Sequence, residues 1–362
     1  MVQISEGKRD IRPASRYLAG HTTISRPELD TEQGMLQVSS FLKDFGATGI
    51  TCISEAIACR LHQYRELLPS GLDLWLPPPD VVQRVLSKRL QTEVARRVGL
   101  DVLPTYYIQS GEDIAGICRE HFPVCLRPAD PGPSKPAFKA RVFFSPGDLA
   151  RFVQSLQLSQ PLMAQPFLDL PNLVLHGARS SSGRDMGLEA FWVPCKFQGV
   201  TLTMKRFKTS EGVIRKCINF VREMGITGSY HFEFLWDQGQ DKLWFLEVNA
   251  RLGGTTAKAL ACGYDEPAMI LKAYGVLDNS KTDVQAADEV NSRTVSSRIA
   301  LGKYFLKNLG SGLDILDYPQ RSRFSNMLFA LVAMLGCRDE VFSWSDLSGS
   351  LALWRASLKK GT

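Results

Sequence analysis

The stretch HFEFLWDQGQDKLWFLEVNARLGG, residues 231–254, places two carboxylates in an otherwise apolar pair of runs. Phe, Leu, Trp and Val flank the polar segment DQGQDK, a pattern typical of a β-hairpin. If the turn is centred on Gln240, Glu233 lies directly opposite Glu247. Directly opposed residues have Cβ atoms only ~4.5–5.5 Å apart, so two like charges there destabilise the pair. Some other interaction must offset this repulsion.

Strand alternation indicates what shares a face with the two carboxylates. It groups Phe245, Glu247 and Asn249 on one face of the second strand. The first strand contributes His231 and Glu233 to that face. The hairpin therefore predicts a polar cluster on one side of the sheet and an apolar side behind it.

Three arrangements could offset the repulsion. One carboxyl could hold a shared proton, or Arg251 could form a salt bridge. A divalent cation could instead bind Glu233, Glu247 and the amide oxygen of Asn249, since Mg²⁺ prefers carboxylates completed by phosphates and water. The alternative is a surface hairpin with solvated glutamates. The hairpin alone leaves these readings open.

Composition narrows the class of protein. The chain has 362 residues, 44% hydrophobic and 22% charged, with a net charge of +6 that is scattered along the sequence. No dense basic run supports nucleic-acid binding. The eight cysteines form no CxxC pair, which favours a reducing, cytoplasmic compartment. No apolar run approaches the ~18 residues of a membrane span, and MLFALVAML at 327–335 predicts a buried helix.

Element patterns divide the chain into zones. Residues 1–34 predict irregular structure, and helix–strand alternation from 35 predicts a wound parallel sheet. One long helix is expected over 80–100 and one strand over 101–108. A small α/β unit follows at 105–170, then a mostly antiparallel sheet over 172–250, then a helical tail. The strands and helices expected in the two middle zones cover 122–128, 140–144, 145–156, 161–168, 172–180, 188–199, 200–207 and 212–225.

The sequence also resembles a known family. FLEVNARLGGTT after HFEFL is similar to the second half of an ATP-grasp domain, in which the E-x-N-x-R strand and a preceding Glu hold Mg²⁺ beneath ATP. Other landmarks occur in the same order over 35–275. The stretch RDEVFSWSD, 338–346, resembles the tail of bacterial carboxylate–amine ligases. The resemblance implies a truncated, Rossmann-like pre-ATP-grasp domain at 1–86. It implies an ATP-grasp domain at 87–275, with a small lobe at about 105–168 and a large lobe at about 169–275, and a helical extension at 276–362.

The resemblance assigns roles to the hairpin residues. Glu233, Glu247 and Asn249 would bind the metal. Arg251 and Asn249 would be catalytic, with the Arg251 guanidinium contacting the transferred phosphate. Lys88 would reach the α and β phosphates from its helix, although a solvated helix charge is the plainer reading of that lysine.

The resemblance also assigns a nucleotide site in the small lobe. Arg127 stands where the family has a lysine. Lys135 lies in a phosphate-covering loop that keeps one glycine, Gly132, among four prolines. The adenine would bind the linker through the Pro166 carbonyl and the Leu168 N–H, with Asp169 at the ribose. The expected linker residues are Gln165, Pro166, Phe167, Leu168 and Asp169.

The function implied is an ATP-dependent ligase with Mg²⁺, or alternatively Mn²⁺. It would convert a substrate carboxylate to an acyl phosphate and join it to an amine, releasing ADP and phosphate. The expected partners are these small molecules, without nucleic acid or membrane, and a homodimer or a chain that completes the N-terminal domain. The rivals are a carboxylase-type ATP-grasp enzyme and a degenerate, non-catalytic nucleotide-binding scaffold. Lys205 and Arg206 could attract an acidic substrate, although exposed strand cations are the commoner explanation.

Overall fold

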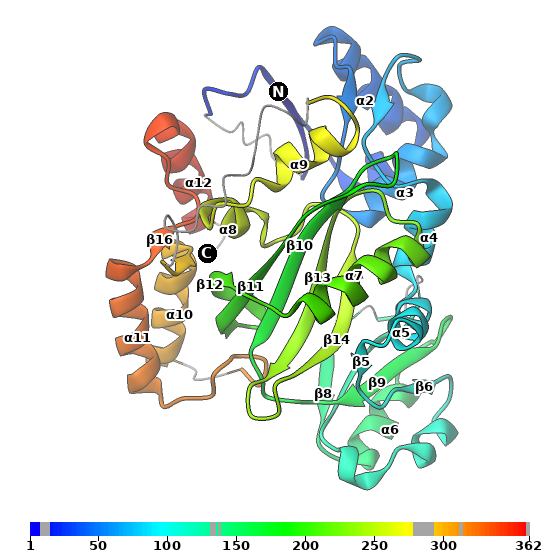
Figure 1. Ribbon diagram of the computed structural model, residues 1–362, viewed down its shortest axis with the longest axis vertical. Helices are drawn as coiled ribbons and strands as arrows, with labels where there is room; N and C mark the ends of the chain where they lie inside the picture. The colour runs from blue at the N-terminus through cyan, green and yellow to red at the C-terminus, as the bar shows by residue number, and fades with distance from the viewer. Residues whose placement is uncertain are drawn as a thin grey trace.

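The computed structural model describes residues 1–7, 15–130, 135–136, 138, 140–277, 293–310 and 314–359, with side chains to 355 (Figure 1). An eight-stranded sheet forms its centre. Its strand order is β16-β15-β12-β11-β10-β13-β14-β5. A separate four-stranded sheet has the order β6-β9-β7-β8. The candidate site lies where these two sheets are connected.

The expectation that residues 1–34 are irregular is wrong. Two strands in this segment pair in parallel, and Ile24 is buried in a core with leucines from the helices that follow. The sequence gives a weak signal here because both strands have only five residues and β2, GHTTI, contains a single large apolar residue. The elements are β1 Val2–Glu6, β2 Gly20–Ile24, α1 Arg26–Leu29, α2 Glu32–Asp44, β3 Gly49–Ile50, α3 Glu55–Gln63 and β4 Asp73–Leu74.

The single helix expected over 80–100 is two helices, α4 Pro79–Leu86 and α5 Lys88–Arg97. Ser87 separates them with extended backbone, and its side chain accepts a hydrogen bond from the Leu90 N–H. Serine favours this N-cap position because its oxygen satisfies a backbone donor that has no partner within the helix. The interruption makes Lys88 the first residue of α5.

The single strand expected over 101–108 is also divided. β5 Asp101–Val102 pairs with β14 in the large sheet, whereas β6 Tyr106–Ile108 pairs with β9 in the small one. Pro104 lies between them and cannot donate to a strand ladder. The chain therefore crosses from one sheet to the other here. The small unit otherwise has the predicted elements: β7 Val124–Pro128, β8 Arg141–Phe143, α6 Pro146–Gln154 and β9 Leu162–Pro166.

The antiparallel zone of the large sheet is confirmed. Phe220 of α7 packs on Phe232 and Phe245, and Phe234 belongs to the same core, so this helix covers the apolar face of the hairpin. The elements are β10 Asn172–Arg179, β11 Asp185–Phe197, β12 Val200–Phe207, α7 Glu211–Met224, β13 Gly228–Asp237 and β14 Lys242–Asn249.

The C-terminal zone is more than a helical tail. Two short strands, β15 Val295–Ser296 and β16 Arg338–Asp339, extend the large sheet beyond β12. Pairs of so few residues carry no period that a sequence pattern could reveal. The helices of this zone and of the segment before it are α8 Thr256–Ala261, α9 Glu266–Ala273, α10 Arg298–Gly310, α11 Arg323–Gly336 and α12 Leu347–Lys359.

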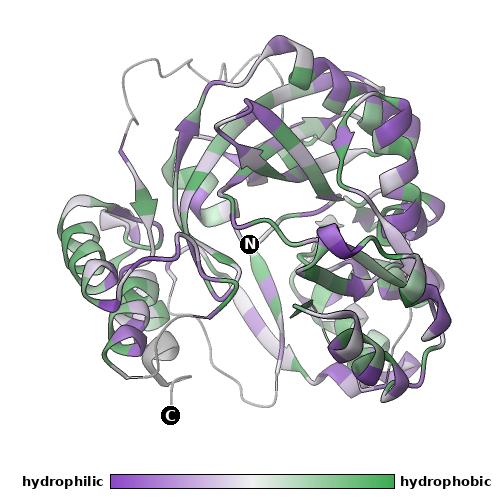
Figure 2. Cartoon of the chain, turned by 90° about the horizontal axis from the view of Figure 1, so that it is seen from below, coloured by the Kyte–Doolittle hydropathy of each residue, from purple (hydrophilic) through white to green (hydrophobic). Residues whose placement is uncertain are grey.

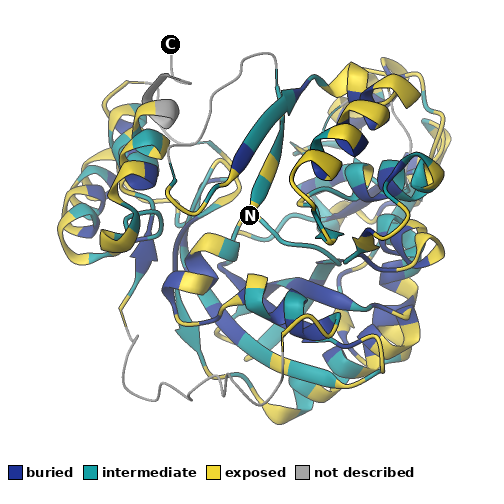
Figure 3. Ribbon diagram, turned by 90° about the horizontal axis from the view of Figure 1, so that it is seen from above, coloured by how far each residue is buried: buried dark blue, intermediate teal, exposed yellow. Residues whose placement is uncertain are grey.

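The helix expected to be buried at 327–335 is α11, and it is buried on one face only. Ala330 and Ala333 pack toward α10, while Leu335 on the other face is 89% exposed. Figures 2 and 3 show apolar and exposed residues together on the helices at this edge of the molecule. No helix in the described part of the chain is both long and apolar enough to span a membrane.

A buried glutamine connects α5 to β14, the strand that carries Glu247 and Asn249. Gln91 is 1% exposed, and its amide accepts from the Val248 N–H at 2.8 Å and donates to the Val248 carbonyl at 2.9 Å. The Gln91 side chain thus makes the two backbone hydrogen bonds that a neighbouring strand would make with the edge of β14.

We expect Gln91→Leu to lower the free energy of unfolding by about 3 kcal/mol, because it leaves a buried N–H and a buried C=O without partners. Chemical denaturation measures this change. Gln37→Leu, on the exposed face of α2, is the matched control and should change the free energy of unfolding by less than about 0.5 kcal/mol. Equal effects of the two substitutions would contradict the assignment.

Candidate active site

The hairpin pairs the two carboxylates as predicted. In the register of β13 and β14, Glu233 lies opposite Glu247 and His231 lies opposite Asn249. The four polar side chains therefore emerge from adjacent pairs on one face. This confirms the polar cluster that the sequence predicts.

A β-bulge produces that register. The pairing shifts between Glu233 and Phe234, which leaves Leu246 as an extra residue on β14. As a result Phe245 lies opposite Phe234 and is 1% exposed in the core. The prediction that Phe245 shares a face with Glu247 is wrong, because a bulge reverses the alternation beyond it.

The bulge also turns a backbone group toward the small lobe. The Leu246 carbonyl accepts a hydrogen bond from Arg127 at 3.0 Å. The same guanidinium donates to the Gln165 side-chain oxygen at 3.0 Å and lies 3.4 Å from Glu247. Arg127 therefore connects the small sheet to β14 at two points, the Leu246 carbonyl and the Glu247 carboxylate.

Two cations offset the repulsion between the carboxylates. The Lys88 Nζ donates a short hydrogen bond to Glu247, and Arg127 adds its charge on the same carboxylate oxygen. The side chains of Glu233 and Glu247 are 34% and 21% exposed, so neither is fully solvated. Lys88 of α5 and Arg127 of β7 therefore form the salt bridges that offset the repulsion. Arg251 instead pairs with Glu55.

The two carboxyls have different affinities for protons. Burial and the charge of Glu247 together raise the pKa of Glu233 to about 7. Burial alone would also raise the pKa of Glu247, but Lys88 and Arg127 outweigh it and lower that pKa to about 2. At neutral pH Glu247 is therefore an anion. The carboxyl of Glu233 is then near the midpoint of its titration.

Asn249 connects the carboxylates to a neutral histidine. Its amide nitrogen lies 3.3 Å from a Glu247 oxygen and 3.2 Å from the His231 Nε2. Burial, then the nearby His176 and Arg251, lower the pKa of His231 to about 3. His231 is therefore an uncharged acceptor for Asn249. A Cβ at Gly253 would lie 2.5 Å from this imidazole, so the close approach requires glycine.

Arg251 pairs with a residue that sequence reasoning missed. Its Nε lies 2.6 Å from Glu55 at the start of α3, while its Nη2 lies 3.5 Å from the Asn249 side-chain oxygen. Glu55 is remote in sequence, and nothing in its local pattern marks it as a site residue. This pair ties the N-terminal helices to the end of β14.

The nucleotide-linker candidates occupy the end of β9 and the turn after it. Gln165 is buried, and both ends of its amide are engaged, with Arg127 and with Thr105 at 3.0 Å each. The Phe167 N–H donates to the Pro123 carbonyl at 2.7 Å, and the Leu168 carbonyl accepts from Leu170. Pro166 is the last residue of β9.

Lys196 of β11, which the sequence analysis did not single out, lies beside the linker. Its Nζ donates to the Leu170 carbonyl at 2.8 Å and to Asn172 at 3.1 Å. Burial lowers the pKa of Lys196 to about 8, and it raises the pKa of Asp169. Lys196 is one residue in a long strand of alternating residues, so nothing in the local sequence marks it as a site residue.

The phosphate-loop prediction is only partly covered by the described residues. Gly132 lies outside them, with 131–134. Lys135 is exposed, and its backbone pairs with Gln157. Lys205 lies over the Trp192 ring at 4.4 Å and Arg206 pairs with Glu189 at 2.8 Å, so the common structural role of strand cations accounts for both.

A buried cluster lies beside the carboxylate pair, on the same face of the sheet. His176, His231 and Glu266 have potential metal-ligand atoms within 4.8 Å of one another. The two imidazole planes differ by 18°, and the His176 Nε2 bonds Thr255 at 3.0 Å. Because Glu266 also accepts from Thr256, the cluster positions the loop after Arg251. Among the described residues, the His231 Nδ1 and one Glu266 oxygen have no hydrogen-bond partner.

Comparison with known proteins shows which families and structures this chain resembles. The family model for the ATP-binding domain of the carbamoyl-phosphate synthase L chain matches residues 200–272. The structure of N5-carboxyaminoimidazole synthetase from Staphylococcus aureus aligns with a TM-score of 0.55 at 13% identity, over 74% of this chain and 69% of that one. The chain has the ATP-grasp fold.

Two other ATP-grasp structures are similar. The L-amino acid ligase from Bacillus licheniformis aligns with a TM-score of 0.55 at 15% identity, over 76% of this chain and 68% of that one. The biotin carboxylase domain of the Hydrogenobacter thermophilus 2-oxoglutarate carboxylase, solved with MgADP, ADP and bicarbonate, aligns with a TM-score of 0.60 at 17% identity, over 78% and 66%. No curated protein sequence matches the chain.

In protein without nucleotide, a Glu-to-Gln substitution should have opposite effects on stability at the two opposed positions of the hairpin. Glu247→Gln removes the partner of Lys88 and Arg127 and should lower the free energy of unfolding by about 1 to 2 kcal/mol. Glu233→Gln removes the like charge and should raise the melting temperature at pH 8. Differential scanning calorimetry measures both.

The gain from Glu233→Gln should shrink as the pH falls. The raised pKa of Glu233 means that its charge opposes folding increasingly from pH 4.5 up to about 7, and no longer does so when the carboxyl is protonated. The gain should therefore be full above pH 7 and absent near pH 4.5. Glu66→Gln, at an exposed position, should leave the profile unchanged. A gain that is constant with pH would contradict the interaction.

Proposed function

We propose that the chain is an ATP-dependent ligase that activates a carboxylate as an acyl phosphate and joins it to an amine. The observation that carries the proposal is the convergence of Glu233, Glu247 and Asn249 with the cations Lys88 and Arg127 on one face of the hairpin. Such a set can hold a metal–nucleotide complex and balance the charge of its phosphates.

The donor atoms fit magnesium. Carboxylate and amide oxygens on adjacent strand positions are the hard ligands that Mg²⁺ and Mn²⁺ accept, and the Asn249 amide, whose nitrogen faces Glu247 here, would turn to offer its oxygen. Glu233, Glu247 and Asn249 would hold the ion, which when bound neutralises charge on the transferred phosphoryl group. The raised pKa of Glu233 fits a position that a cation completes.

The cations would then serve the nucleotide. Lys88 stands at the start of α5 and Arg127 at the end of β7, so both reach the carboxylate pair from the small-lobe side. We assign Lys88, Arg127 and Lys135 to the phosphates. The Pro166 carbonyl and the Leu168 N–H would bind the adenine. Asp169 would bind the ribose. Gln165 orients Arg127 rather than the base.

The second step would take place at the end of β14. Arg251, held by Glu55, presents its guanidinium beside Asn249, where it would stabilise the acyl phosphate and the oxyanion. The Gly253 N–H already donates to the Thr256 hydroxyl at 2.9 Å, so Gly254 is the better backbone donor. The buried His176–Glu266 network fixes this loop.

A carboxylase that forms carboxyphosphate from bicarbonate is the second candidate, favoured by the similarity to biotin carboxylase structures. In both cases an oxygen nucleophile attacks the terminal phosphate. We assign the protein to the cytoplasm, which its eight free cysteines support, and we propose that it is a homodimer or binds a further chain.

Mg-ATP should raise the melting temperature of the wild-type protein, because a ligand that binds only the folded state stabilises it. Differential scanning fluorimetry with and without a chelator measures this. Glu247→Gln should abolish the shift, whereas Glu66→Gln should retain it. A shift that survives Glu247→Gln would remove the metal from the proposed site.

A panel of carboxylates with hydroxylamine separates the candidate functions. Hydroxylamine converts an acyl phosphate to a hydroxamate without the natural amine, so a ligase should release ADP and hydroxamate together. ADP release with bicarbonate alone would indicate the carboxylase. A Mg-ATP shift without ADP release across the panel would contradict catalysis and leave a nucleotide-binding scaffold.

A further inference from the structure

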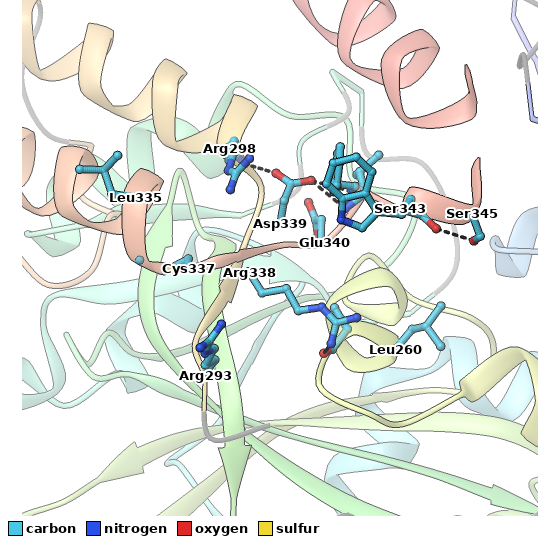
Figure 4. A pocket seen from close by; sticks show the side chains of 15 residues that line it. Leu260, Arg293, Arg298, Leu335, Cys337, Arg338, Asp339, Glu340, Ser343 and Ser345 are labelled. Atoms are coloured by element: carbon cyan, nitrogen blue, oxygen red, sulfur yellow. Dashed lines mark hydrogen bonds between the residues drawn. The ribbon is translucent and has the colours of Figure 1, made fainter. Parts of the chain in front are cut away.

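A large cavity lies away from the carboxylate pair. It has a volume of about 1340 Å³ and lies between the end of α8, the start of α10, the end of α11 and the segment from β16 to Ser345 (Figure 4). Ligand pockets usually occupy ~300–1,000 Å³, so the space is ample for a small molecule. None of the residues that line it belongs to the proposed ATP site.

The two acidic side chains of the cavity wall are already engaged. Asp339 is buried and accepts hydrogen bonds from the backbone N–H groups of Arg298, Val341 and Phe342 at 2.9–3.0 Å. Glu340 pairs with Lys258 of α8 at 2.7 Å, and both side chains are nearly buried. Glu340 is thus neutralised by Lys258, and the Asp339 oxygens are occupied by backbone N–H groups, so the charge of Asp339 remains as one negative charge on a wall with three arginines.

Three arginines also line the cavity. Arg293, Arg298 and Arg338 all contribute to its wall, as Figure 4 shows. Arg338 donates to the Ala261 carbonyl at 3.0 Å. Within the described residues, no carboxylate forms an ion pair with the Arg293 or Arg298 guanidinium. The like charges of Arg293 and Arg298 on one hollow are unfavourable alone, and an anion bound there would offset them.

An aromatic wall accompanies the arginines. Trp344 is 81% exposed, although it lines the cavity, and the Phe342 ring contacts it edge-on at 4.9 Å. Phe342 in turn lies 6.0 Å from Trp354 of α12. An indole supported from behind offers an open face on which a flat apolar group can stack.

We propose that this cavity binds a small molecule in which a carboxylate or phosphate is attached to a flat apolar ring. The anionic group would lie between Arg293 and Arg298, whose forked donors match either group. The ring would lie against Trp344. This inference stands apart from the proposed ligase function, because the cavity and the ATP site share no residue.

Isothermal titration calorimetry of the full chain tests the proposal with four probes: phenyl phosphate, benzoate, inorganic phosphate and neutral benzamide. We expect phenyl phosphate or benzoate to bind and benzamide not to bind, and the tighter of the two identifies the anionic group. The double variant Arg293→Gln/Arg298→Gln should weaken this binding about a hundredfold, about tenfold for each charged donor removed.

Matched variants separate a specific site from general charge. Lys303→Gln/Arg323→Gln removes the same charge from α10 and α11 outside the cavity and should leave binding unchanged. Trp344→Ser should weaken phenyl phosphate or benzoate binding but not that of inorganic phosphate. Glu247→Gln should leave binding unchanged, which distinguishes this site from the ATP site. Absence of binding by both ring-bearing anions, or equal binding to the arginine double variant, would overturn the proposal.

Discussion

The repulsion between two carboxylates across one strand pair organises the candidate site. Glu233 and Glu247 are directly opposed on a partly buried face, an arrangement that is unfavourable alone. Lys88 and Arg127 offset it from two other elements, so the small lobe, α5 and the large sheet meet at one charge cluster. Because one carboxylate is paired and its partner is not, their pKa values move in opposite directions. That asymmetry is a local property of the hairpin and its neighbours.

The scaffold around the cluster is fitted to hold β14 in place. Gln91 binds both backbone groups of Val248, and the bulge at Leu246 offers a carbonyl to Arg127. On the far side the aromatic residues of the hairpin pack on α7. These contacts fix the strand from its edge, its bulge and its apolar face. Side chains that must present oxygen atoms at defined positions benefit from such rigid support.

The sequence was sufficient for the parts of the fold that rest on local pattern. Period-two alternation and a polar turn predicted the hairpin and the opposed glutamates, and a quoted motif pointed to the ATP-grasp fold. The predictions that are wrong concern features that tertiary contacts determine. Ser87 divides a continuous helical pattern by capping α5, and a bulge moves Phe245 into the core. The pairing of Arg251 with Glu55 joins residues far apart in the chain, so no local signal could reveal it.

The central claim is that the opposed carboxylates hold a metal ion between the sheet and the phosphates of a nucleotide. A crystal structure grown with Mn²⁺ and a non-hydrolysable ATP analogue tests it most directly, because manganese can be located by its anomalous scattering. The account predicts an anomalous peak coordinated by Glu233, Glu247 and the Asn249 oxygen, with Lys88 moved from Glu247 to a phosphate. A nucleotide bound elsewhere, with Lys88 still paired to Glu247 and no peak at the hairpin, would contradict it.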